Sequence, residues 1–255
     1  MDMHALPHLT NESGFAAVAA FAARDLDLTL GVIRPAGGSL LVQQHSDGGA
    51  RVRVEGVPAA DDDRTDGWAW ARGDVKSTLA EHGIMTWKCE RSTGTRLGWD
   101  IILPTAGAVR LLTALIKSGM NAVERAALAL TLALYEAGIE VRAAVDDDEA
   151  LQPLALDAED ALALWKLLHG TSDRPAHIDI STWAGLDKLA GRLMRLPKLA
   201  VLIEAQPGCD DCAPPKPNRV RFGALTADEA QSLAAAVARR TAAAAQPTAP
   251  SGGQA

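Results

Sequence analysis

Two cysteines with two residues between them, Cys209 and Cys212, are the most chemically specific pattern in the sequence. Two thiolates at this spacing supply half of a tetrahedral zinc site, or they form a redox pair. A structural zinc site needs two more ligands, and the sequence has no second cysteine pair and no histidine pair nearby. Three residues elsewhere in the chain are candidates for the missing ligands: Cys89, His169 and His177.

The two residues between these cysteines are aspartates, whose negative charge disfavours the thiolate that a redox pair requires. We therefore expect a polar hairpin loop without a cofactor at this place. A zinc site through Cys209 and Cys212 is the alternative.

A second candidate site is a local excess of positive charge in the last third of the chain. Lys188, Arg192 and Arg195 have the spacing of residues on one face of a helix, and Arg219 and Arg221 follow nearby. Residues 183–222 hold seven basic against four acidic side chains, whereas the whole chain has a net charge of −7. This surface could bind phosphate groups, nucleic acid or an acidic protein, and an ordinary solvated face is the alternative.

Tryptophan is unusually frequent, with six residues against one tyrosine. Trp68 and Trp70 would share one face of a strand, and an exposed pair would suit a partner surface because tryptophan is common at binding hot spots. Burial of the pair against a neighbouring hairpin is the alternative. We expect Trp87, Trp99 and Trp165 in the core.

The sequence contains no recognisable catalytic motif. A glycine-rich phosphate loop, a Gly-x-Ser-x-Gly elbow and a His-Glu-x-x-His pair are absent, and the six histidines are scattered. Three acidic runs lack the alternating spacing of a calcium loop and fall in expected turns: 61–63, 146–149 and 210–211. The remaining enzyme hypothesis is a metal site assisted by the cysteine pair.

The composition is that of a globular protein in water, with 48% hydrophobic and 22% charged residues. The negative net charge argues against binding to nucleic acid over the whole surface. We see no secretion signal and no apolar run long enough to span a membrane. Three cysteines fit a reducing compartment, so we expect a cytoplasmic protein.

A repeated pattern determines the expected fold. The runs 79–84 and 134–139 both read as a helix end stopped by glycine and followed by a strand, and residues 182–240 contain a looser copy. We therefore expect an α+β fold of repeated helix–hairpin–helix (αββα) units, in which antiparallel hairpins pack on helices in two layers.

These patterns divide the chain into five expected segments. They are an N-terminal helix with a three-stranded meander (1–60), three αββα units (68–120, 121–171 and 172–241) and a disordered, Ala- and Pro-rich tail (242–255). In the first segment we expect a helix over 12–25. The strands of the meander are expected at 28–33, 40–44 and 51–57.

Each unit is expected to contain one antiparallel hairpin, built from two runs of suitable pattern: 85–90 with 97–103, 139–142 with 154–156, and 199–203 with 220–224. Helices are expected to begin after residues with capping side chains: Thr105, Asn121, Asp157, Thr182 and Thr226. Gly138 is expected to end a helix.

These observations favour a non-catalytic protein-binding or adaptor module with an unidentified protein partner and no membrane contact. The alternatives are a nucleic-acid or phosphate-binding protein centred on the basic third unit, and an enzyme with a Cys-assisted metal site. The sequence does not indicate an oligomeric state.

Overall fold

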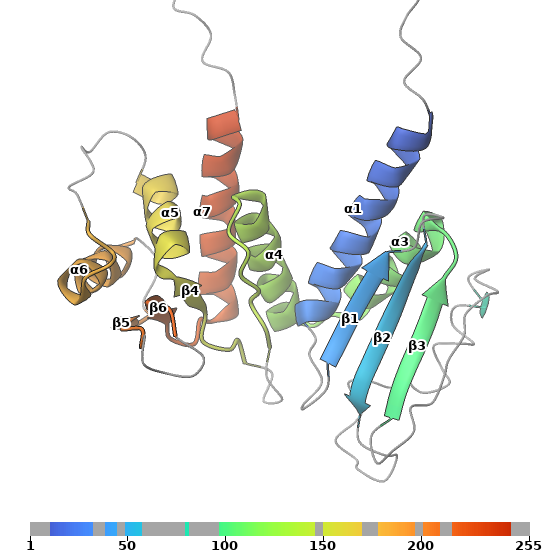
Figure 1. Cartoon of the computed structure of the whole chain (residues 1–255), viewed down its shortest axis with the longest axis horizontal. Helices are drawn as coiled ribbons and strands as arrows, with labels where there is room; N and C mark the ends of the chain where they lie inside the picture. Colours follow the sequence, from blue (N-terminus) through green and yellow to red (C-terminus); the bar gives the residue numbers. More distant parts are fainter. Residues whose placement is uncertain are drawn as a thin grey trace, which may run out of the picture. The chain divides into compact units, whose positions relative to one another are not determined.

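The computed structural model of the chain describes residues 11–32, 39–44, 49–57, 80–81, 97–145, 150–169, 178–196, 201–209 and 216–245. These residues form α-helices and two small antiparallel three-stranded sheets, as Figure 1 shows, which makes the fold α+β. The chain divides into two compact units, Met1–Met120 and Asn121–Ala255. Within the described ranges, no helix combines the length and the apolar character that a membrane crossing requires.

Within the described residues, the first unit contains a three-stranded sheet, helices α1 and α3, and the helical residues 80–81. Its elements are α1 (Asn11–Val32), β1 (Ser39–Gln44), β2 (Ala50–Val57), β3 (Leu97–Leu103) and α3 (Ala106–Gly119). The strands pair in the order β1-β2-β3. Thr105 caps α3, and the helix buries the stripe Val109, Leu112 and Ile116. Helix α1 buries Leu26, Leu30 and Val32.

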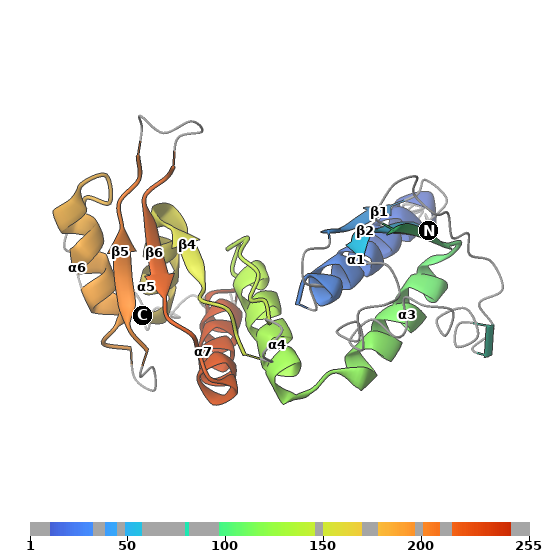
Figure 2. The ribbon, with the colours of Figure 1, turned by 90° about the horizontal axis from the view of Figure 1, so that it is seen from below.

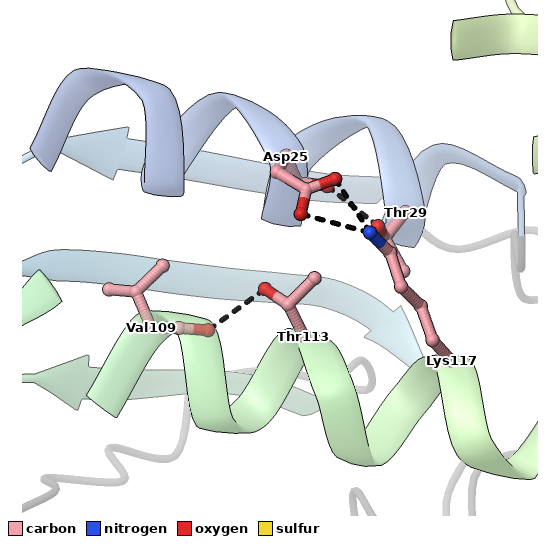
Figure 3. Close-up of polar contacts among 5 residues, drawn as sticks. All are labelled: Asp25, Thr29, Val109, Thr113 and Lys117. Atoms are coloured by element: carbon pink, nitrogen blue, oxygen red, sulfur yellow. Dashed lines mark hydrogen bonds and ion pairs between the residues drawn. The ribbon is translucent and has the colours of Figure 1, made fainter. Parts of the chain in front are cut away.

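A lysine from α3 and an aspartate from α1 join the two helices (Figure 3). Lys117 Nζ lies 2.8 Å and 2.9 Å from the two carboxylate oxygens of Asp25. Two threonines satisfy their hydroxyls inside their own helices: Thr29 donates to the Asp25 carbonyl and Thr113 to the Val109 carbonyl. Polar side chains therefore sit in the packed region between α1 and α3 without losing hydrogen bonds.

The prediction of a three-stranded meander in residues 1–60 is wrong for one of its strands, 28–33. Residues 28–32 belong to α1, and the third strand of the sheet is β3, which comes from a later segment. The alternation of Leu28 and Leu30 predicted a strand. However, Thr29 between them is also fully buried, so this helical turn is covered on all sides. The alternation of leucine and threonine therefore does not distinguish the two-residue period of a strand from the 3.6-residue period of a helix.

The second unit places two helices on a sheet and packs two more beside it. Its elements are α4 (Ala122–Glu136), β4 (Ala155–Asp157), α5 (Ala158–His169), α6 (Trp183–Leu193), β5 (Ile203–Gln206), β6 (Arg219–Phe222) and α7 (Ala227–Ala245). The strands pair in the order β4-β6-β5, and Figure 2 shows them side by side. Val220 and Phe222 are fully buried, whereas Arg219 and Arg221 on the opposite face of β6 are exposed.

The hairpin expected from 139–142 and 154–156 does not form. Residues 139–144 belong to no strand, the Ala144 carbonyl accepts a hydrogen bond of 2.8 Å from the Gln152 nitrogen, one isolated bridge joins Val145 to Leu151, and β4 pairs with β6. The reason lies in α4, where the buried Thr131 hydroxyl accepts a hydrogen bond of 3.0 Å from the backbone nitrogen of Ala143. Ala143 is thus held against the helix, pairing is limited to the single bridge, and the repeated αββα units are not confirmed.

The expectations that depended on local signals are confirmed more often. Capping side chains are found at Thr105, Asn121, Thr182 and Thr226, and Asn121 forms a full capping box with Glu124. Gly138 follows α4 with a φ of 79°, a conformation that favours glycine. The third expected hairpin forms as β5 and β6. Helix α7 continues to Ala245, past the expected start of the tail at residue 242.

The run expected to pair with β3 in a hairpin, 85–90, lies outside the described residues. The finer division into segments at residues 60, 121 and 171 stays a prediction.

Candidate binding site on helix α6

The capped first turn of α6 is fixed to the loop before it. Thr182 accepts a hydrogen bond of 3.2 Å from the Gly185 nitrogen, and its hydroxyl donates to the Asp179 carbonyl at 2.9 Å. Gly185 is buried because the Asp179 carbonyl occupies the space next to its Cα. The inner side of the helix buries Leu186, Leu189 and Leu193. This inner stripe determines which residues face outward.

Two large apolar side chains lie on the outer side of α6. Trp183 is 55% exposed and Met194 is 40% exposed. At about 100° per residue, both fall on one line along the helix with Asp187 between them. Burial of an exposed tryptophan or methionine against a partner would be favourable, because it removes apolar surface from water. We did not identify either residue from the sequence, although their positions outside the leucine stripe were a readable signal.

A cationic line lies about 100–140° around the helix from this apolar line. Lys188 and Arg195 are exposed, and the helical spacing places them on the same side of α6. Asp187 is the acidic side chain closest to them along the outer turns of the helix. The outer side of α6 therefore combines apolar anchors with positive charge. We call this set of residues the α6 surface: Trp183, Lys188, Met194 and Arg195.

Arg192 has the spacing of the cationic line but points elsewhere. It is half-buried, and its Cζ atom lies 4.9 Å from the centre of the Trp165 ring of α5. The His169 ring lies 5.2 Å from the same tryptophan ring, tilted by 32°. Trp165 is only 5% exposed, which confirms its expected place in the core. We call Trp165, His169 and Arg192 the α5–α6 stack.

The α5–α6 stack contains two polar atoms without partners. Trp165 Nε1 and His169 Nδ1 are both buried and make no hydrogen bond. Native proteins satisfy most buried donors and acceptors, so two such atoms one helical turn apart require an explanation.

The remaining basic candidates do not join the α6 surface. Arg219 Nε lies 2.9 Å from Asp157 Oδ1, and both side chains are about half exposed. Arg221 lies opposite Glu204 in the β5–β6 register. Because side chains alternate along β6, these arginines lie on the face of the sheet away from Val220, with acids beside them.

An acidic cluster lies at the start of α5. Burial raises the pKa of Asp160, and the neighbouring charges of Asp157, Glu159 and Glu140 raise it further. The described part of the chain holds no group of three acidic, cysteine or histidine side chains arranged for a metal ion.

The cysteine pair is described only in part. Cys209 exchanges two backbone hydrogen bonds of 2.9 Å with Lys216, at the base of the hairpin loop, and it is disulfide-bonded. A disulfide sulfur is not the thiolate that zinc binds, so the zinc hypothesis applies to the reduced chain and stays a prediction. Cys212, Trp68 and Trp70 lie outside the described residues.

No protein-family model, curated protein or solved structure matches the chain.

Proposed function

We propose that the chain is a non-catalytic binding protein whose α6 surface docks a short acidic segment of a protein partner. The observation that carries the proposal is the pair of exposed apolar side chains, Trp183 and Met194, on one line of a helix whose inner side is packed. Tryptophan and methionine are enriched at protein interfaces, and tryptophan dominates hot spots.

Charge complementarity selects the kind of partner. Lys188 and Arg195 add positive charge on the same exposed half of α6 as the apolar line, within a protein of net charge −7. Acidic side chains on the partner would be attracted locally and would discriminate against basic segments. The line from Trp183 to Met194 spans about 16 Å of helix, which suits a peptide of a few residues carrying one or two apolar anchors.

The phosphate-binding alternative has less support. Continuous tracking of nucleic-acid phosphates would require the arginines of β6 to act together with those of α6. Arg219 is paired with Asp157, and Arg221 lies opposite Glu204 on the outer face of the sheet. The enzyme alternative requires reduced cysteines and further ligands.

Two broader expectations also stay proposals. The αββα repeat is supported by the matching runs 79–84 and 134–139 and weakened by the hairpin that does not form after α4. The low cysteine count supports a cytoplasmic location. The disulfide at Cys209 is evidence against it, because disulfides are rare in a reducing compartment.

Selection from a random peptide display library on the full chain tests the proposed function. We expect the enriched peptides to contain acidic residues next to aromatic or aliphatic ones. A synthetic copy of one peptide should lose at least about tenfold in affinity for the double variant Trp183→Ala/Met194→Ala, since hot-spot truncations cost ~2 kcal/mol or more. Phe21→Ala is the matched control, because Phe21 is 70% exposed in the other unit.

Three results would overturn the proposal. They are the absence of any enriched peptide, enrichment without acidic residues, and binding that the double variant leaves unchanged. A single-stranded oligonucleotide that binds more tightly than the peptide, with a steep salt dependence, would favour the nucleic-acid alternative instead.

A further inference from the structure

We infer that the α5–α6 stack is an oxyanion-binding site, which receives a carboxylate of the docked segment. This inference rests on the proposed function and adds a specific acceptor for one acidic group. The Arg192 guanidinium would supply the positive charge, and Trp165 Nε1 and His169 Nδ1 would supply neutral hydrogen bonds.

The state of Arg192 is the first argument. Within the described ranges, no carboxylate pairs with this half-buried guanidinium, which rests on the face of Trp165. An arginine that stacks on an aromatic ring keeps its N–H groups in the plane of the guanidinium, where they are free to bind a carboxylate in bidentate fashion. The stack also restricts the side chain, so less conformational freedom is lost on binding.

The two unpartnered nitrogens are the second, independent argument. Trp165 is only 5% exposed, and its indole N–H can only donate. His169 Nδ1 can donate when it carries the proton. Both nitrogens are already desolvated in the free protein, so an incoming oxygen restores hydrogen bonds that folding removed. All three groups of the stack thus fit the same ligand chemistry, an oxygen with negative charge.

The location of the stack connects it to the α6 surface. Arg192 lies one turn after Lys188 on α6, and Arg195 follows it by three residues, just past the end of the helix. The exposed pair would raise the local concentration of anions, and the half-buried arginine would bind one of them at close range. The shared chemistry is an oxyanion, and its source is either an acidic side chain of the docked segment or a free phosphate.

Nuclear magnetic resonance of the uniformly ¹⁵N-labelled full chain tests the site directly. Trp165→Phe assigns the indole N–H signal of Trp165, and Trp183→Phe assigns that of Trp183. The chain is titrated with a selected acidic peptide, with inorganic phosphate and with acetate, against a chloride control at equal ionic strength. We expect the peptide to shift both indole signals in a saturable manner.

Substitutions at position 192 test the role of the guanidinium. Arg192→Lys keeps the charge but removes the planar fork, and we expect the affinity for the peptide to fall about tenfold or more. Lys166→Gln is the matched control, because it removes one positive charge from an exposed position of α5 and should leave the affinity within about twofold. The amide spectrum of each variant reports whether the fold is retained.

The outcomes separate this inference from the proposed function. If the peptide binds the α6 surface but the Trp165 signal does not move, or Arg192→Lys binds normally, the oxyanion site is wrong and the docking surface stands. If phosphate shifts Trp165 and no peptide is selected, the site stands with a free anion as its ligand and the proposed function fails. If chloride produces the same shift as phosphate and acetate, the site is wrong.

Discussion

Replacing Gly185 by alanine should loosen the attachment of α6 and with it the candidate site. A Cβ atom at this position would lie 1.8 Å from the Asp179 carbonyl oxygen and 2.6 Å from its carbon. Both are backbone atoms, so no side-chain rotation relieves the clash. The φ of Gly185 is not in the left-handed region, which means that close approach alone explains the glycine.

Three contributions determine the size of the effect. Overpacking of this kind costs ~1–3 kcal/mol. Moving the Asp179 carbonyl disturbs its hydrogen bonds with the nitrogen and hydroxyl of Thr182, and loss of such a cap costs ~1 kcal/mol. Alanine recovers ~1 kcal/mol through its higher helix propensity. We expect the free energy of unfolding of the second unit to fall by about 1–3 kcal/mol.

Gly191 provides a matched control in the same helix. A Cβ atom there meets nothing within 4 Å, so Gly191→Ala should raise stability by ~0.5–1 kcal/mol. Urea unfolding followed by far-UV circular dichroism compares the two variants at equal protein concentration, with separate transitions fitted for the two units. The reasoning is refuted if Gly185→Ala unfolds at the same urea concentration as Gly191→Ala, or at a higher one.

Three further predictions concern the rest of the chain. A double-mutant cycle with Asp25→Asn and Lys117→Met should give a coupling free energy of ~0.5–1 kcal/mol, because both partners are about one-third exposed; a value near zero in urea unfolding would contradict this. Asn121→Ala should lower the stability of the second unit by ~1 kcal/mol, whereas Asn121→Ser should keep most of it in the same assay. Burial and neighbouring acids raise the pKa of Asp160 in the folded state above its ordinary 3.8. Protonation of Asp160 therefore stabilises the folded state at a pH below 3.8, and this stabilisation is lost as the pH rises through the pKa of the folded state. Asp160→Asn should therefore raise the urea midpoint at pH 7, and this gain should shrink toward pH 4; an equal gain at both values would show that the charge is not responsible.

The helix starts could be predicted because their signals are local. Thr105 and Thr182 each bond to a backbone nitrogen three residues ahead, and Asn121 and Glu124 bond to each other's backbone. Such contacts involve one turn of chain and need no knowledge of the fold. The same holds for the glycine that ends α4.

Strand pairing and the candidate site depend on contacts between distant segments. The sequence predicted β3 as a strand but not its addition to β2, because a period of two describes one strand and not its neighbour. The sequence predicted Arg192 on one helix face with Lys188, but its half-buried contact with Trp165 depends on how α5 and α6 pack. Sequence spacing alone describes neither relationship.

The strand order of the second sheet has a consequence for synthesis on the ribosome. Of the three strands in this sheet, β4 is synthesised first. Its partner β6 begins only at Arg219. Helix α4 likewise packs on α7, which begins at Ala227. The first unit has its sheet and helices α1 and α3 by Gly119, so it can fold while the second is still being made. The side of α4 that packs on α7 must then stay uncovered until α7 is made, and we expect a nascent-chain chaperone to bind this stretch during that time.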